Sequence, residues 1–252
     1  MEQDLVLDFT GVYASEKDHM PKTMEYVNVT DMKGTDMYCS KEAEEQIRKR
    51  LEAYGPSGIH FLDSGNYHYV TKFFVEKIKK PFSLVLFDYH DDMRQPMIHD
   101  LTSCGSWARE VLLENPYLRQ LIIIGPDEKT LDGVDEKVSN KLISISIQEL
   151  EAEKAKKKIA RIDQSVPVYI SIDKDVLSRS YAVTNWNQGK MSLDMLEDIL
   201  SIILVVCDVI GVDICGEYSS AEGRLSDYLK AEATNQSTNR KLYEYIRSFL
   251  EK

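Results

Sequence analysis

Two carboxylates and an imidazole stand at alternate positions directly after an apolar stretch of the chain. The residues are Asp88, His90 and Asp92, and the stretch before them, 83–87, reads Ser-Leu-Val-Leu-Phe. Alternate residues of an extended chain project from the same side. Carboxylate and imidazole groups that share one side form a donor set suited to a divalent cation. The spacing therefore predicts a metal site where this strand ends.

Three further polar clusters follow apolar runs in the same way. Asp173 and Asp175 come directly after one run, His68 lies just beyond another, and Glu217 follows a fourth. In an open parallel sheet, ligands bind outside the carboxyl ends of the strands, which meet at one edge. We therefore expect the clusters to converge on one site.

The balance of donor atoms indicates the kind and number of metal ions. A surplus of carboxylates over imidazoles, without a thiolate, suits Mn²⁺ or another oxygen-preferring divalent ion. Four carboxylates crowded together would be costly, and two divalent cations would neutralise them. An Asp pair after a strand is more often a turn or a helix cap, but several such clusters in one chain favour a metal centre. The predicted ligands are His68, Asp88, His90, Asp92, Asp173 and Asp175.

Apolar runs and helical segments alternate along the chain. The runs predict strands at 5–9, 59–62, 83–87, 121–124, 142–145, 166–172 and 205–214. The periodic, charged segments predict helices at 41–53, 70–79, 107–112, 147–162, 193–204 and 240–250. Strands that are apolar throughout are buried on both faces, so we predict a three-layer α/β/α fold with a central, mostly parallel sheet. We expect a single domain over 1–252, with loops at 11–35 and 219–238 around the site.

Composition narrows the function classes. The formal net charge of -11 disfavours binding to nucleic acid, which needs clustered Lys and Arg. The acidic N-terminus does not resemble a signal peptide, and no apolar run reaches the roughly 20 residues of a spanning helix. The four cysteines form no CxxC pair, so reduced thiols are expected. We therefore predict a cytoplasmic protein that acts away from membranes.

The metal motifs resemble those of a known family. His68, then Asp88-x-His90-x-Asp92, then Ser171-x-Asp173-x-Asp175 resemble the ureohydrolase superfamily of arginases, agmatinases and formimidoylglutamases. The resemblance covers roughly residues 55 to 218, and the combined pattern is specific although each piece is short. It implies an arginase/deacetylase-like fold, two Mn²⁺ ions, with other divalent ions possible, and oligomers in many members.

The resemblance also implies roles for the ligands. It would assign His68 and Asp92 to one ion and His90 and Asp175 to the other, with Asp88 and Asp173 between them. Family members use metal-activated water to attack the carbon of a guanidino or amidino group, which is consistent with what two cations do to a shared water. Asp92 would then be catalytic, because it is placed to help move the proton of that water.

Three departures from the family pattern concern proton transfer and the substrate. Cys104 stands where the family commonly has a His-Gly step, so Cys104 or His99 is the candidate proton shuttle, unless Cys104 only fills a buried space. The family's substrate-binding glutamate would fall at Gly216, and Glu217 lies one residue later. It reaches a cationic substrate if the backbone turns at Gly216, and otherwise serves as a structural acid. The loop after Asp175 is rebuilt, so Trp186 and Asn187 are candidates for substrate contact or packing.

We therefore predict a binuclear manganese hydrolase that cleaves a C–N bond in a small cationic guanidino or amidino compound, with arginine itself disfavoured. One alternative is a deacetylase-like amidohydrolase, which would use one zinc and a histidine pair that the sequence does not show. Another is an inactive relative in which the metals stabilise a binding or regulatory module. A homo-oligomer is possible from the resemblance.

Overall fold

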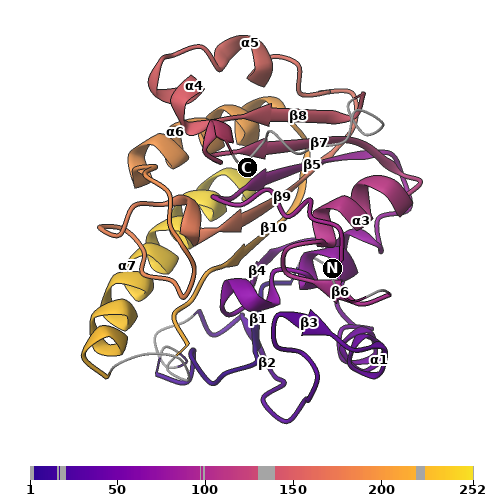
Figure 1. Ribbon diagram of the computed structural model, residues 1–252, viewed down its shortest axis with the longest axis vertical. Coiled ribbons are helices and arrows are strands. Elements are labelled where there is room, and N and C mark those ends of the chain that lie inside the picture. Colours follow the sequence, from indigo (N-terminus) through magenta and orange to yellow (C-terminus); the bar gives the residue numbers. More distant parts are fainter. Residues whose placement is uncertain are drawn as a thin grey trace.

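The computed structural model describes residues 3–15, 17, 21–96, 98, 100–129, 140–219 and 225–251. Its centre is an eight-stranded sheet in which every pair of neighbouring strands is parallel (Figure 1). In order across the sheet, the strands are β2 (Glu25–Asn28), β1 (Leu5–Asp8), β4 (Ile59–Phe61), β10 (Val209–Cys215), β9 (Val168–Asp173), β5 (Phe82–Phe87), β7 (Leu118–Ile124) and β8 (Leu142–Ile145).

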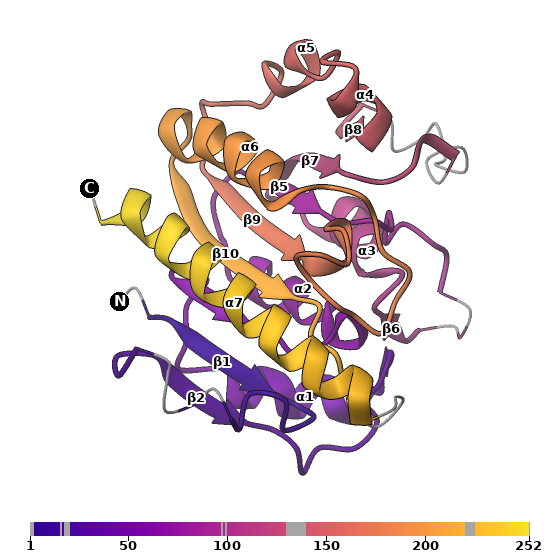
Figure 2. The ribbon, with the colours of Figure 1, turned by 90° about the vertical axis from the view of Figure 1, so that its left-hand side faces the viewer.

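Helices cover both faces of this sheet. One face carries α1 (Lys41–Arg50), α2 (Val70–Val75) and α3 (Trp107–Glu114), and the other carries α4 (Ile147–Glu151), α5 (Lys156–Ile159), α6 (Leu193–Val206) and α7 (Leu225–Leu250). In Figure 2 the long α7 crosses the second face in front of β1 and β10. The predicted three-layer α/β/α fold is therefore confirmed.

The alternation of side chains in β5 shows how one strand serves two cores. Leu84 and Leu86 pack with the residues of α1, α2 and α3, whereas Val85 and Phe87 pack with those of α6 and α7. All six residues of the strand are buried. A strand covered on both faces has no reason to alternate apolar with polar residues, which is why the sequence shows it as a continuous apolar run.

The predicted helix at 147–162 is two short helices. A capping box at Ser146 starts α4, and α5 begins at Lys156. Between them Glu153 has a φ of 54°, a left-handed conformation that an α-helix does not contain. The periodicity of charged residues continued across this break, and so the sequence did not reveal it.

The predicted strand at 205–214 begins later than expected. Residues 205 and 206 belong to α6, whose buried positions Leu196, Ile199, Leu200 and Ile203 follow helical spacing. The β-branched pair Val205 and Val206 ends the helix on its exposed side. Side-chain type alone indicated a strand here, but packing of the helix against the sheet prevails.

The stretches expected as loops contain regular structure. Within 11–35, β2 pairs with β1 as the edge strand of the sheet. Within 219–238, α7 begins at Leu225. Its polar residues are buried against another segment: Asn235 exchanges two hydrogen bonds with the backbone of Val183, and Thr238 donates to the carbonyl of Tyr181. A polar helix face that meets polar backbone gives no apolar signal, so the prediction of a loop was wrong.

A small antiparallel ribbon lies beyond the main sheet. It pairs β3 (Tyr38–Cys39) with β6 (Thr102–Ser103). Two short 3₁₀ helices stand after strands of the sheet: η1 (Gly65–Tyr67) begins four residues after the end of β4, and η4 (Lys174–Val176) follows β9 directly. These pieces stand at the carboxyl-terminal edge of the sheet, where the polar clusters converge. Within the described part of the chain, no helix combines the length and apolar character needed to cross a bilayer.

Candidate metal centre

Three strands from a group of four neighbours bring the predicted ligands to one place. β4, β10, β9 and β5 are neighbours in the sheet, and the ligands follow three of them: His68 after β4, the Asp88 cluster after β5, and Asp173 with Asp175 at the end of β9. Donor atoms of His68, Asp88 and Asp92 lie within 4.8 Å of one another, as do those of Asp88, His90 and Asp175. Two three-residue groups therefore share Asp88.

The segment after β5 is shaped so that its side chains face inward. The backbone N–H of His90 donates to Asp88 Oδ1 at 2.6 Å, and His90 Nδ1 lies 2.8 Å from Asp175 Oδ2. Asp92 has a φ of 49°, a left-handed conformation that Asp tolerates better than most residues. Its Oδ2 accepts a hydrogen bond of 2.6 Å from Trp107 Nε1. An α3 residue thus fixes the carboxylate that we predicted to be catalytic.

His68 is held from behind by a chain of buried hydroxyl and carboxyl groups. Its Nε2 lies 2.8 Å from Ser171 Oγ, and Ser171 donates to Asp213 Oδ1 at 2.5 Å. Because the serine donates its proton to Asp213, its oxygen accepts from Nε2–H, and the lone pair of Nδ1 is left on the other side of the ring. Metal-binding histidines are commonly oriented by such a partner on the second nitrogen.

The free side of His68 faces negative charge. Nδ1 lies 3.3 Å from Asp88 Oδ2, 3.2 Å from Asp92 Oδ2 and 3.6 Å from Asp173 Oδ2. Among the described residues, this buried nitrogen has no hydrogen-bond partner. A lone pair that faces three carboxylates is repelled unless a cation stands between them.

The charges of the ligand side chains also favour a bound cation. Burial, followed by the charge of Asp92, raises the pKa of Asp88, and burial with the charge of Asp88 raises the pKa of Asp175 to about 7. Burial lowers the pKa of His90, but its bonds to Asp175 and Asp88 outweigh this and raise it to about 12. A histidine that holds a proton beside carboxylates of raised pKa, as His90 does, marks a site that a divalent cation could occupy in place of the proton. The residues therefore fit a pair of metal ions.

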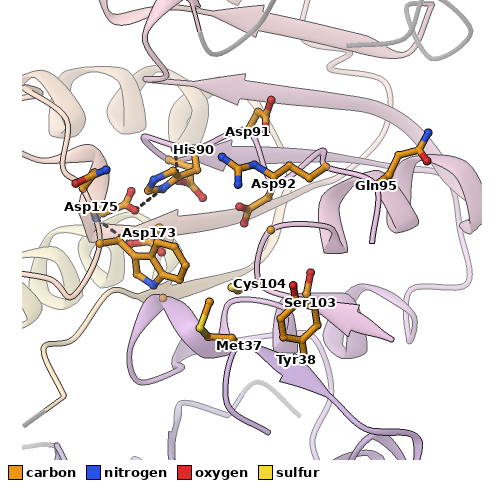
Figure 3. Close-up of a pocket in the computed structure, with 16 residues that line it drawn as sticks. Met37, Tyr38, His90, Asp91, Asp92, Gln95, Ser103, Cys104, Asp173 and Asp175 are labelled. Carbon is orange, nitrogen blue, oxygen red and sulfur yellow. Dashed lines mark hydrogen bonds and ion pairs between the residues drawn. The ribbon is translucent and has the colours of Figure 1, made fainter. Parts of the chain in front are cut away.

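The ligand group opens on a cavity of about 230 Å³. Figure 3 shows His90, Asp92, Asp173 and Asp175 on one side, with Cys104, Ser103, Tyr38 and Met37 opposite, on and beside the β3–β6 ribbon. Trp186 and Asn187, the candidates for substrate contact or packing, also line the cavity. Trp186 is held by a 2.8 Å hydrogen bond from its Nε1 to Asn66 and by edge contact with the ring of His90.

Of the two candidate proton shuttles, Cys104 lines the cavity. Burial, followed by the charge of Asp92, raises the pKa of the Cys104 thiol to about 12. A thiol with a raised pKa is a poorer proton acceptor near neutral pH than an imidazole. His99 lies outside the residues that the structure describes.

Glu217 lies apart from the cavity. Gly216 has a φ of +93°, so the chain turns after β10, and Glu217 pairs with the amino group of Lys174. Asn239 of α7 donates to Glu217 Oε1 at 2.8 Å and accepts from Lys174 Nζ at 2.7 Å. Glu217 is not among the residues that line the cavity. Its carboxylate serves a buried ion pair, so of the two roles considered for it the structural one agrees with the geometry.

Sequence reasoning missed several residues around the site. Cys215 ends β10 with its thiol 3.2 Å from Asp173 Oδ2, and its donor atom groups with those of His68 and Asp173. Trp107 binds Asp92, and Asp213 supports His68 through Ser171. A buried tryptophan carries no local pattern. Asp213 and Cys215, however, are two apart at a strand end in the manner of the other ligands, which was a usable signal.

Comparisons with known proteins agree with this geometry. The chain matches the family described as "Arginase family" over residues 10–220. A protein of Thermotoga maritima described only as uncharacterized is 32% identical over 214 residues, which span 84% of this chain and 78% of that protein.

Solved structures share the fold at low sequence identity. Formimidoylglutamase from Bacillus subtilis has a TM-score of 0.68 at 14% identity, over 98% of this chain and 87% of that one. Proclavaminate amidino hydrolase from Streptomyces clavuligerus has a TM-score of 0.66 at 15% identity, over 97% and 92% of the two chains. The agmatine ureohydrolase of Thermoplasma volcanium has a TM-score of 0.66 at 16% identity, over 98% and 91%.

Proposed function

The chain belongs to the arginase family, and we propose that it is a binuclear metal-dependent hydrolase of a C–N bond in a small linear amidine or guanidino compound. The observation that carries the proposal is the ligand group that opens on the cavity. Its two three-residue sets share Asp88, and His68 presents an unpartnered nitrogen to three carboxylates.

The ligands divide between two metal positions. We assign His68 and Asp92 to one ion and His90 and Asp175 to the other, with Asp88 and Asp173 between them; Mn²⁺ is the first candidate. When bound, such a pair lowers the pKa of a water molecule and stabilises negative charge that develops on the attacked group. Asp92 takes the proton of the attacking water, while its hydrogen bond from Trp107 holds it in place.

The walls of the cavity suggest the shape of the substrate. Trp186 offers a flat apolar face to a planar amidine, and Asn187 a side-chain amide to its nitrogen or oxygen atoms. Among the described residues that line the cavity, Arg94 is the only arginine or lysine, and so carries a permanent positive charge. Glu217, the carboxylate that a second amine on the substrate would need, pairs with Lys174 instead. We propose that the far end of the substrate carries an acidic group that Arg94 meets, rather than a second amine.

The proposal is tested by turnover of the metal-loaded protein on a panel of linear compounds. The panel contains guanidino and formimidoyl compounds with an acidic or an amino tail, together with acetylated amines. The assay measures release of urea from the guanidino compounds, of formamide from the formimidoyl compounds and of acetate from the acetylated amines. We expect amidine hydrolysis with preference for acidic tails. Asp92→Asn should lower kcat strongly, whereas Arg94→Ala should raise KM for acidic substrates and leave kcat nearly unchanged.

Three outcomes would contradict the proposal. Hydrolysis of acetylated amines alone would favour a deacetylase-like enzyme. Metal binding without turnover on any compound would favour a binding or regulatory module. Failure to bind a divalent metal after reconstitution would remove the basis of the proposal.

A further inference from the structure

Cys215 faces the ligand group because of its register in the sheet. Cys215 is paired with Asp173 on the neighbouring strand, and Asp213 with Ser171. Residues opposite each other in adjacent strands project to the same face. Consistent with this, Ser171 donates to Asp213, and the Cys215 thiol donates to Asp173 Oδ2 at 3.2 Å. The thiol is fully buried.

A second observation points to a ligand at this place. His68 Nδ1, in a residue that is 1% exposed, has no hydrogen-bond partner among the described residues. This nitrogen lies 3.6 Å from Asp173 Oδ2, the same oxygen that accepts the Cys215 thiol, and donor atoms of His68, Asp173 and Cys215 lie within 4.8 Å of one another. One cation placed among them could touch nitrogen, oxygen and sulfur together.

We propose that Cys215 is a sulfur ligand of the ion on the His68 side, so that the two metal positions prefer different metals. This rests on the proposed binuclear centre. The other group, Asp88, His90 and Asp175, offers only nitrogen and oxygen donors. Sulfur favours borderline ions such as Zn²⁺, Co²⁺ or Fe²⁺, whereas carboxylates and imidazole also serve Mn²⁺.

The binding step is a simple exchange of a proton for a metal ion. The S–H bond of Cys215 breaks, a metal–sulfur bond forms with the electron pair left on sulfur, and the proton leaves to solvent. No electron is transferred. Asp173 Oδ2, which accepts the thiol hydrogen in the structure, is placed to receive that proton first.

The alternative role for Cys215 is that of a small apolar residue in a tight space. Cys215 does pack within the apolar core on the α1–α3 side, and free buried cysteines often do no more than this. A thiol that only packs gives no signal in the spectrum of a bound metal. Spectroscopy therefore separates the two roles, whatever the variant does to stability.

Cobalt substitution tests the proposal directly. Protein loaded with Co²⁺ should show visible ligand-field bands from the bound ions and a near-ultraviolet sulfur-to-cobalt charge-transfer band. Cys215→Ser should keep the visible bands and lose the charge-transfer band, and its Zn²⁺ affinity should fall on the order of 100-fold, since losing even an indirect partner of a ligand costs 10–100-fold. The matched control is Cys104→Ser, the thiol that lines the opposite wall, which should keep both bands.

The outcomes separate this inference from the proposed function. Visible bands without a charge-transfer band in the unmodified protein overturn the sulfur ligand but leave the binuclear centre intact, and so does loss of the band in Cys104→Ser instead. No uptake of Co²⁺ overturns both. If Cys215→Ser does not fold, X-ray absorption at the zinc edge of the unmodified protein decides the question: a sulfur neighbour at about 2.3 Å supports the ligand, and nitrogen and oxygen neighbours alone at about 2.0–2.1 Å refute it.

Discussion

Replacing Glu217 by glutamine separates its two possible roles. Glu217 is one residue from the place where the resemblance puts a substrate-binding glutamate, yet in the structure it pairs with Lys174 and Asn239. If the role of Glu217 is to neutralise Lys174, then Glu217→Gln leaves the buried ammonium group of Lys174 without a counter-charge. If its work is to hold substrate, the same change alters KM and leaves the fold as stable as before.

The burial of the pair sets the expected size of the effect. The side chain of Lys174 is 0% exposed and that of Glu217 is 2% exposed. Removing one partner of such a buried pair costs about 3–5 kcal/mol, because the remaining charge stays desolvated. For a chain of this length, that loss lowers the melting temperature by about 6–20 °C. Asn239 still hydrogen-bonds to both positions, so the loss should lie toward the lower end.

Urea unfolding followed by tryptophan fluorescence measures this cost, with a double variant as the internal check. Lys174→Met combined with Glu217→Gln removes both charges, so it should be more stable than Glu217→Gln alone. Glu153→Gln is the control: Glu153 faces Lys156 at 4.0 Å with both side chains more than four-fifths exposed, and this change should leave stability unaltered. Unchanged stability of Glu217→Gln, together with a raised KM, would refute the structural role.

Three other predictions concern the support of the site and its pH dependence. Ser171→Ala removes the partner of His68 Nε2 and should weaken metal binding 10–100-fold in a Mn²⁺ titration; Ser83→Ala, a buried serine without a hydrogen-bond partner among the described residues, should not. Gly216→Ala places a Cβ 2.6 Å from Asp173 Oδ1 at a φ of +93° and should lower both stability and metal affinity, whereas Gly11→Ala, at +81° with no atom within 4 Å, should leave metal affinity intact. Burial lowers the pKa of His60 to about 4, so as the pH falls the unfolded chain binds a proton at His60 before the folded chain does. The stability that neutral His60 contributes is complete above about pH 6.5 and is lost by about pH 4. Between about pH 7 and about pH 5 it falls by about 2 kcal/mol. Over that interval His60→Phe should lose correspondingly less stability in urea unfolding than the unmodified protein, and equal losses would show that His60 is not buried neutral.

The sequence reveals the parts of the site that depend on a few consecutive residues. Asp88, His90 and Asp92 stand at alternate positions at a strand end, as do Asp173 and Asp175, and the structure brings them together because their strands are neighbours. Period-two spacing and apolar runs are properties of a few consecutive residues. These patterns predict the structure correctly because the geometry of a β-sheet is regular.

Features that depend on pairing between distant segments were not visible. Glu217 lies away from the site because Lys174, 43 positions away, offers a buried charge. The polar stretch before Arg240 reads as a loop because its partners lie in the 181–183 segment. Each of these requires the three-dimensional neighbour to be known first.

The positions of bound metal ions test the central claim most directly. Crystals grown with Co²⁺, which both donor sets accept, should give two anomalous-scattering peaks at the cobalt edge. One peak should lie by His68 and Asp92 and the other by His90 and Asp175, with Asp88 in contact with both. A single peak, or none within this group of residues, would contradict the binuclear centre.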